Sequence, residues 1–141
     1  VFIMPADGSQ PPVNITEHPD DDMSPVWSKD GRKLAFVSRR VGDTFDIWFV
    51  FLRKKDNDKT KEDWEDEKEA LKAKKGKKNV VPTVKIDFKN IYWRLRRVTS
   101  LPGDESGVRI SPDGETFVFA TNSAGKQDLW SVAWDGSKLK Q

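Results

Sequence analysis

Cysteine is absent from this chain of 141 residues, and histidine and tyrosine occur once each. The lack of cysteine excludes disulfides, thiolate metal sites and cysteine nucleophiles, but it is compatible with any redox compartment. The longest apolar run, Ile47 to Leu52, is far shorter than the roughly 20 residues that a membrane-spanning helix needs. We therefore expect no membrane span, and the localisation stays unknown, with periplasmic, extracellular and cytoplasmic sites all open.

A dominant charge of one sign is missing as well. Lysine and arginine together number 25 and aspartate and glutamate 23, so the net charge is only +2 although 34% of the residues are charged. This balance does not indicate a nucleic-acid partner. The chain starts with Val-Phe-Ile-Met and has no signal-peptide pattern, which suggests a segment cut from a longer polypeptide.

The sequence does contain an internal repeat, whose clearest mark is a Ser-x-Asp-Gly turn that occurs twice. In such a turn the Asp side chain can bond back to the backbone, and Gly supplies the positive φ of a tight hairpin. The six turn residues are Ser28, Asp30, Gly31, Ser111, Asp113 and Gly114. The match continues, after one deletion, with Asp46–Val50 against Asp128–Val132, and Val1–Ser9 matches Leu129–Ser137.

The strands beside these turns, such as Lys33–Ser38 and Thr116–Thr121, are largely apolar on both faces, so both faces should be covered. Four-stranded antiparallel units of this kind can stack radially as β-propeller blades. A β-sandwich is the main alternative, but its strands alternate apolar and polar residues and need no repeated turn. The expected fold is all-β, a partial propeller of about two and a half four-stranded blades.

These residues resemble a known family. Ile15–Val50 is similar to the TolB-type β-propeller repeat, with an acidic loop, Pro-x-Trp-Ser-x-Asp-Gly, a Phe-x-Ser strand and Asp-Ile-Trp. Val98–Gly136 is similar too, but has Val108 and Ile110 where the family has Pro and Trp. A narrower resemblance, to the propeller of tricorn-like serine peptidases, covers Val84–Ser106.

The repeat suggests boundaries within a single partial propeller. Residues 1–18 would be the end strands of one blade, residues 19–99 a second blade with a rim insertion at 53–84, and residues 100–141 a truncated third blade. The insertion is highly charged, with too little apolar surface to offset its ordering entropy. A short exposed helix is expected over Lys61–Lys75. For the insertion as a whole we favour a solvated rim hairpin. The alternative is a basic docking or nucleic-acid arm at Lys72–Lys78.

Candidates for chemistry are few. His18 is the only histidine, so any Ser-His or His-metal site would need it, and it lies in a loop without a partner. The run Asp20–Asp22 lacks the spacing of a calcium loop. Asp104 and Glu105 occupy the same loop in the next copy, which favours carboxylates that bond backbone amides. With no nucleophile elbow or phosphate loop, we predict no catalytic residue, metal site or cofactor.

The resemblance implies a non-catalytic propeller segment of a larger hydrolase, with a tricorn-like serine peptidase as the best candidate, which would act as a scaffold or gate peptides. The alternative is a stand-alone protein-interaction propeller of the cell envelope. Expected partners are the remaining blades or further copies of the chain, and a peptide or protein ligand. From blade geometry, the residues expected to face a channel are Met23, Val26, Gly107 and Arg109.

Overall fold

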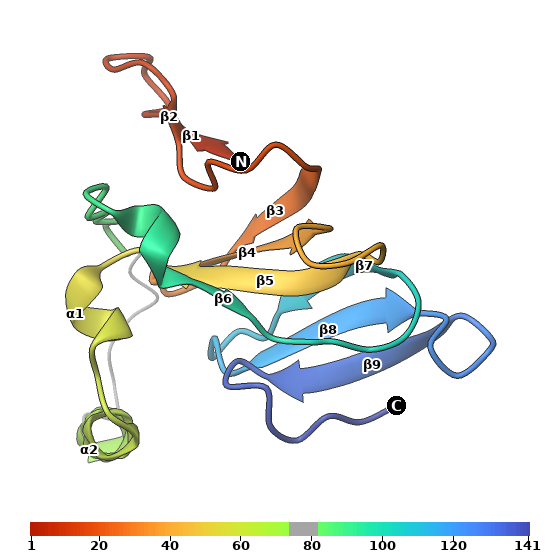
Figure 1. Ribbon diagram of the computed structural model, residues 1–141. Coiled ribbons are helices and arrows are strands. Elements are labelled where there is room, and N and C mark those ends of the chain that lie inside the picture. Colours follow the sequence, from red (N-terminus) through yellow and green to blue (C-terminus); the bar gives the residue numbers. More distant parts are fainter. Residues whose placement is uncertain (74–81) are drawn as a thin grey trace.

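The computed structural model describes residues 1–73 and 82–141, and these form three antiparallel sheets with two short helices at one side (Figure 1). We call the sheets blades 1, 2 and 3. Blade 1 consists of β1 (Phe2–Ile3) and β2 (Val13–Asn14). Blade 2 has β3 (Asp22–Trp27), β4 (Lys33–Ser38), β5 (Asp46–Phe51) and β6 (Leu95–Arg97), in that order across the sheet. Blade 3 has β7 (Glu105–Ile110), β8 (Thr116–Thr121) and β9 (Asp128–Ala133).

Blades 2 and 3 repeat each other in register. β3 pairs with β4, and β7 with β8, through the same irregularity, which falls between Met23 and Val26 in one blade and between Ser106 and Arg109 in the other. A bridge between Ser131 and Lys140 marks the place of a fourth strand in blade 3. This architecture is the partial propeller that the sequence predicted.

The core lies between the sheets. β4 and β5 are buried along their whole length, as expected for strands with two apolar faces. One apolar cluster lies between blades 2 and 3 and includes Phe49, Phe51, Phe117 and Phe119. A smaller cluster joins blade 1 to blade 2. Stacking of the sheets therefore buries both faces of the middle blade.

The charged insertion leaves blade 2 after β5 and returns at β6. It contains α1 (Lys54–Asn57), α2 (Lys61–Ala73) and a short 3-10 helix, η1 (Ile91–Arg94). Because β6 begins at Leu95, the excursion from the sheet runs past residue 84, where the sequence analysis placed its end. The helix expected over Lys61–Lys75 is present as α2 as far as Ala73. Most of the basic stretch Lys72–Lys78 lies outside the described residues.

Two local features start and anchor α2. Thr60 and Asp63 form a reciprocal capping pair: Asp63 Oδ2 accepts from Thr60 N at 2.8 Å, and Thr60 Oγ1 accepts from Asp63 N at 3.2 Å. Trp64 is buried and stacks on Phe51, with ring centroids 5.5 Å apart. Trp64 of α2 and Ile91 of η1 are both buried against the blades, so the insertion is partly packed on them, whereas the sequence analysis favoured a solvated rim hairpin.

Candidate interaction surfaces

The two predicted turns have the same hydrogen bonds. In blade 2, Ser28 Oγ donates to Asp30 Oδ1 at 2.5 Å, and Asp30 Oδ1 also accepts from Arg32 N at 3.0 Å. In blade 3, Ser111 Oγ and the backbone N–H of Glu115 bond to Asp113 Oδ1 at 2.5 and 3.0 Å. Gly31 and Gly114 have φ of +68° and +76°, where a side chain would be strained. The structure gives these six residues the geometry of turn formation.

The paired turns allow a matched test. Replacing Asp30 by alanine should cost about 1–2 kcal/mol of unfolding free energy, because the buried Ser28 hydroxyl and the Arg32 N–H both lose the carboxylate oxygen that accepts from them. The same change at Asp113 should cost about half as much, because Ser111 is more exposed and water can replace the carboxylate. Urea unfolding of both variants measures the two values. Equal losses would show that burial of the turn serine does not matter.

The four residues proposed to face a channel do not share one environment. Met23 and Arg109 are exposed, and Gly107 has a φ of +62° within the irregularity of β7. Val26 is half-buried and packs against the cluster between blades 2 and 3. Their role in a channel stays a prediction. His18 is half-exposed, and its Nδ1 accepts from Asp20 N at 3.2 Å within its own loop.

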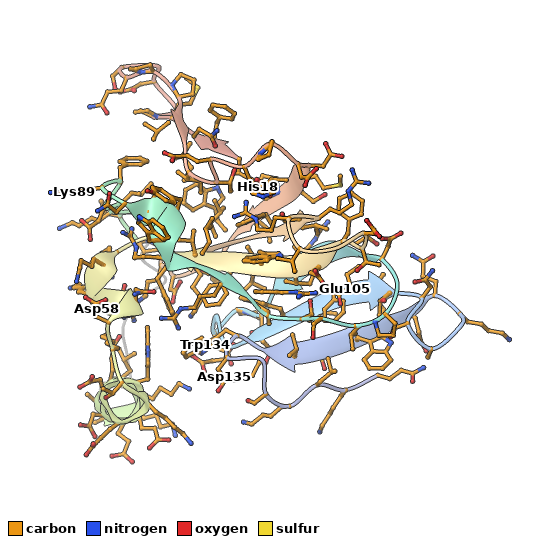
Figure 2. The ribbon with its side chains drawn as sticks, in the orientation of Figure 1. His18, Asp58, Lys89, Glu105, Trp134 and Asp135 are labelled. Carbon is orange, nitrogen blue, oxygen red and sulfur yellow. The ribbon has the colours of Figure 1, made fainter. Side chains whose placement is uncertain are left out.

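A carboxylate joins blade 2 to blade 3. Glu105 is 1% exposed, and its Oε2 accepts from the backbone N–H of Ile47 at 3.0 Å and from the Thr99 hydroxyl. The neighbouring Asp104 accepts from Phe45 N at 3.1 Å. Both carboxylates thus bond backbone amides of the preceding blade, as the sequence analysis favoured for this loop. Figure 2 shows Glu105 where the two sheets meet.

A second buried carboxylate lies at the same seam. Asp46 is fully buried, and Arg97 Nη2 lies 2.9 Å from its Oδ2 as an ion pair that lacks the alignment of a hydrogen bond. Burial raises the pKa of Asp46. Burial also raises the pKa of Glu105 to about 7, and the charge of Asp46 adds to this effect. The seam therefore holds two carboxyl groups whose charged forms are disfavoured.

A buried lysine marks where the insertion covers this seam. Lys33 is 1% exposed, and its Nζ lies 5.4 Å from the ring centroids of Phe51 and Trp64 and 5.7 Å from that of Trp134. Burial lowers the pKa of Lys33. The ring faces attract the ammonium group and offset part of its desolvation. The sequence analysis missed this cluster, although Trp64 is the only aromatic residue in the charged stretch.

Corresponding positions on the blades differ sharply in exposure. Val108 of β7 is fully buried, because β7 packs against β3, β4 and β5 of the preceding blade, whereas its counterpart Pro25 on β3 is exposed. On the other side, Ile47 of β5 is fully buried, but its counterpart Leu129 on β9 is 65% exposed. The same apolar position is thus covered in one blade and open in another. We call the exposed side of β3 face N and the exposed side of β8 and β9 face C.

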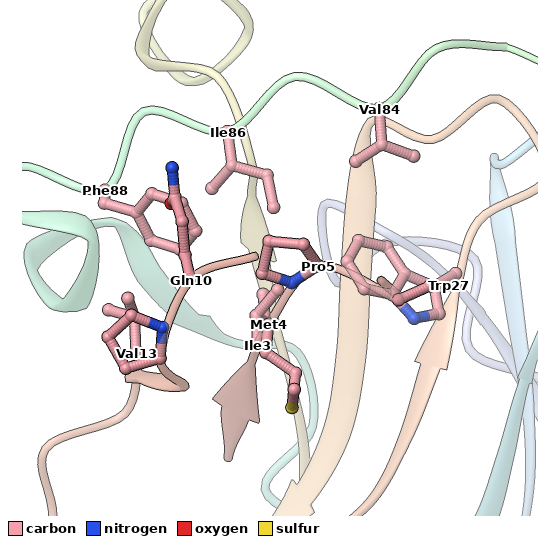
Figure 3. Close-up of a pocket in the computed structure, with 11 residues that line it drawn as sticks. Ile3, Met4, Pro5, Gln10, Val13, Trp27, Val84, Ile86 and Phe88 are labelled. Carbon is pink, nitrogen blue, oxygen red and sulfur yellow. The ribbon is translucent and has the colours of Figure 1, made fainter. Parts of the chain in front are cut away.

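Face N continues into an apolar groove of about 500 Å³ (Figure 3). Ile3 and Pro5 of blade 1, Trp27 of β3, and Val84 and Phe88 of the returning insertion line it. Trp27 is 45% exposed. Its counterpart Ile110 is better covered because it packs on the core that blade 2 supplies. The groove is therefore the part of face N where the first strands of a preceding blade would lie.

Residues 1–73 and 82–141 contain no group of three or more His, Cys, Asp or Glu side chains placed to hold a metal ion. No helix within these ranges combines the length and the apolar character needed to cross a membrane. The candidate interaction surfaces of the described residues are therefore the exposed apolar faces N and C.

Comparison with solved structures identifies the fold. A protein assigned as TolB from Agrobacterium tumefaciens matches with a TM-score of 0.59 and 20% identity, over 99% of this chain and 36% of that one. TolB from Acinetobacter baumannii matches with the same TM-score and 19% identity, over 99% of this chain and 25% of that one. The chain has the fold of a TolB-type β-propeller segment. No protein-family model and no curated protein matches it.

The solved structures bear on one of the two predicted resemblances. The TolB-type propeller fold is confirmed, and the chain spans about a third and a quarter of the two solved TolB chains. The matched region therefore covers nearly all of this chain but less than half of either solved protein. The narrower resemblance to tricorn-like peptidases stays a prediction.

Proposed function

We propose that this TolB-type segment is a non-catalytic protein-interaction module whose faces N and C bind further blades of the same type. The supporting observation is the contrast in exposure at corresponding positions, namely Leu129 at 65% against Ile47 at 0%. Burying an exposed leucine contributes about 1.5–3 kcal/mol.

The occupant of each face follows from the seam between blades 2 and 3. There β7 presents Val108 to the preceding blade, and β4 and β5 present Ala35 and Ile47 to the following one. Face N repeats the first surface and face C repeats the second. Face N of one unit therefore matches face C of another, so that units join head to tail. In a solution of the purified chain, the matching blades come from a second copy.

Two leucines of similar exposure provide a controlled experiment. Leu129 on face C is 65% exposed and Leu71 on α2 is 62% exposed. Leu129→Glu should weaken self-association at least about tenfold, because a carboxylate would be desolvated in the interface. Leu71→Glu should leave association unchanged. Sedimentation equilibrium over a range of concentrations measures both variants. A wild-type chain that stays monomeric throughout, or equal effects at both leucines, would contradict the proposal.

The wider context of the segment is a further part of the proposal. A larger hydrolase, with a tricorn-like serine peptidase as the best candidate, would use the propeller as a scaffold or to gate peptides. A stand-alone propeller of the cell envelope would use it to bind a protein partner. The complete gene distinguishes them: a following peptidase domain supports the first, and only further repeats after a secretion signal support the second.

A further inference from the structure

The insertion carries an aromatic side chain with an unusual position. Trp93 in η1 is 75% exposed, more than any other large apolar side chain in the described ranges 1–73 and 82–141. Its ring contacts that of Tyr92, with centroids 4.9 Å apart. η1 leads into β6, the outer strand of blade 2. Neighbouring blades pack on the faces of a sheet, so closing a ring would leave Trp93 accessible.

Polar groups surround this ring. Trp93 lines a hollow of about 720 Å³ together with residues of α1 and of the returning chain, including Asn57, Asp58, Lys89 and Asn90. Figure 2 shows Asp58 and Lys89 on the side of the molecule that carries α1 and η1. In the part of the chain that the structure describes, the side chains of Lys89 and Asn90 form no hydrogen bond or ion pair. They are available to a ligand.

The hollow is held by a buried guanidinium group. Arg94 is 7% exposed and donates to the carbonyl oxygens of Phe51 and Leu52, at 3.2 and 3.1 Å, at the end of β5. It also donates to the carbonyl oxygens of Asp87 and Lys89, at 2.5 and 3.3 Å, in the returning chain. These four bonds fix the wall of the hollow to the sheet. A fixed wall reduces the ordering cost of binding.

The charges of the lining exclude two classes of ligand. Three cations, Lys54, Lys89 and Arg94, line the hollow with two carboxylates, Asp58 and Asp87. Because the Arg94 guanidinium is buried on carbonyl oxygens, the charges open to a ligand are two of each sign. A nucleic acid would need a cationic surface, and the two carboxylates would repel its phosphates. A purely apolar segment would leave the amide and carboxylate groups without partners. A neutral ligand with one apolar face and several hydroxyl groups satisfies both the ring and the polar lining.

We propose that this hollow is a carbohydrate-binding site that takes a neutral sugar ring stacked on Trp93. The C–H groups on one face of a pyranose would contact the electron-rich face of the indole. Its hydroxyl groups would accept from Lys89 and Asn90 and donate to Asp58 or Asp87. The hollow shares no lining residue with the groove of face N, although Phe88 of that groove lies between Asp87 and Lys89 in the chain.

The test uses the whole chain and the indole N–H signals of its six tryptophans in NMR spectra. Maltotriose, cellotriose and N-acetylchitotriose are the probes, and adenosine monophosphate is the competing class. At least one trisaccharide should shift the Trp93 signal with a dissociation constant of about 1 mM. The Trp93→Phe variant serves to assign that signal and should retain sugar binding within a few fold. Because it lacks the indole N–H, its binding is measured by saturation transfer from protein to sugar.

Removal of the ring should weaken binding strongly. Trp93→Ala should weaken the sugar at least about tenfold. Leu71→Ala removes an apolar side chain of similar exposure outside the hollow and should bind the sugar as the wild type does. Matching thermal melts establish that both variants are folded. Three trisaccharides without effect, unchanged binding by Trp93→Ala, or a response to the nucleotide alone would each overturn the assignment.

Discussion

Replacing Phe49 by alanine is expected to lower the free energy of unfolding by about 3–5 kcal/mol, a large part of the stability of a domain of this size. Phe49 is 1% exposed and makes edge-on contacts with Phe51, Phe117 and Trp134, at centroid distances of 5.1, 5.5 and 6.1 Å. The change would remove a ring shared by blades 2 and 3 and leave a cavity between two sheets. Urea unfolding followed by circular dichroism measures the loss.

Phe2 provides the control for this experiment. It is 66% exposed on β1, so Phe2→Ala should change the free energy of unfolding by no more than about 0.5 kcal/mol. Similar losses for the two variants would show that the seam between blades 2 and 3 is not the main core. An unchanged Phe49→Ala variant would contradict the packing directly.

The repeat made the architecture predictable from the sequence. Ser28, Asp30 and Gly31 recur in the next copy, and residues that recur with the same turn chemistry indicate the same local fold. Two-faced apolar strands then favoured stacked blades over a sandwich. The turns could be recognised because a turn depends on residues that are close together in the sequence. Each recognised turn then indicated where the next strand begins.

The insertion could not be predicted in the same way. The order of its charges, acidic residues first and basic residues after them, suits the helix dipole and predicted a helix from about Lys61, where α2 begins. The packing of Trp64 on Phe51 and Lys33 depends on contacts between residues distant in sequence, and no periodicity records them. The hollow beside Trp93 is of the same kind, because Arg94 builds it by bonding carbonyl groups of separate segments.

Corresponding residues lie at the two seams on either side of blade 2. Glu105 in blade 3 matches Asp22 in blade 2, and Thr99 matches Thr16. Thr16 Oγ1 accepts from the amine of Val1 at 2.6 Å, as Thr99 Oγ1 accepts from Ile47 N at 2.9 Å. The threonine contact thus recurs at both seams, whereas Asp22 bonds Arg40 and lies 4.0 Å from the amine of Val1. A further blade docking on face C would bring the same pair of groups to the backbone N–H of Leu129.

The seam should also make stability depend on pH, through Glu105. Its pKa is raised to about 7 in the folded chain, from an ordinary value of 4.5, chiefly by burial and to a smaller extent by Asp46. Folding therefore favours the protonated carboxyl group. This contribution is fully present below about pH 4.5 and is lost as the pH rises through about 7, because the buried group must then ionise.

Such a shift corresponds to a loss of about 2–3 kcal/mol between pH 5 and pH 8. Glu105→Gln should remove most of it, because the amide oxygen can still accept from Ile47 N and the side chain cannot ionise. Unfolding free energies from urea titrations at several pH values test this, with Glu69→Gln on the exposed side of α2 as the control. If the Glu105→Gln chain weakened with rising pH as much as the wild type, another group would control the seam. If the Glu105→Gln chain kept its stability at high pH, ionisation of Glu105 would also weaken the packing of blade 3 on blade 2 above neutral pH. The reason is that Glu105, on the first strand of blade 3, accepts a hydrogen bond from the backbone of β5 in blade 2.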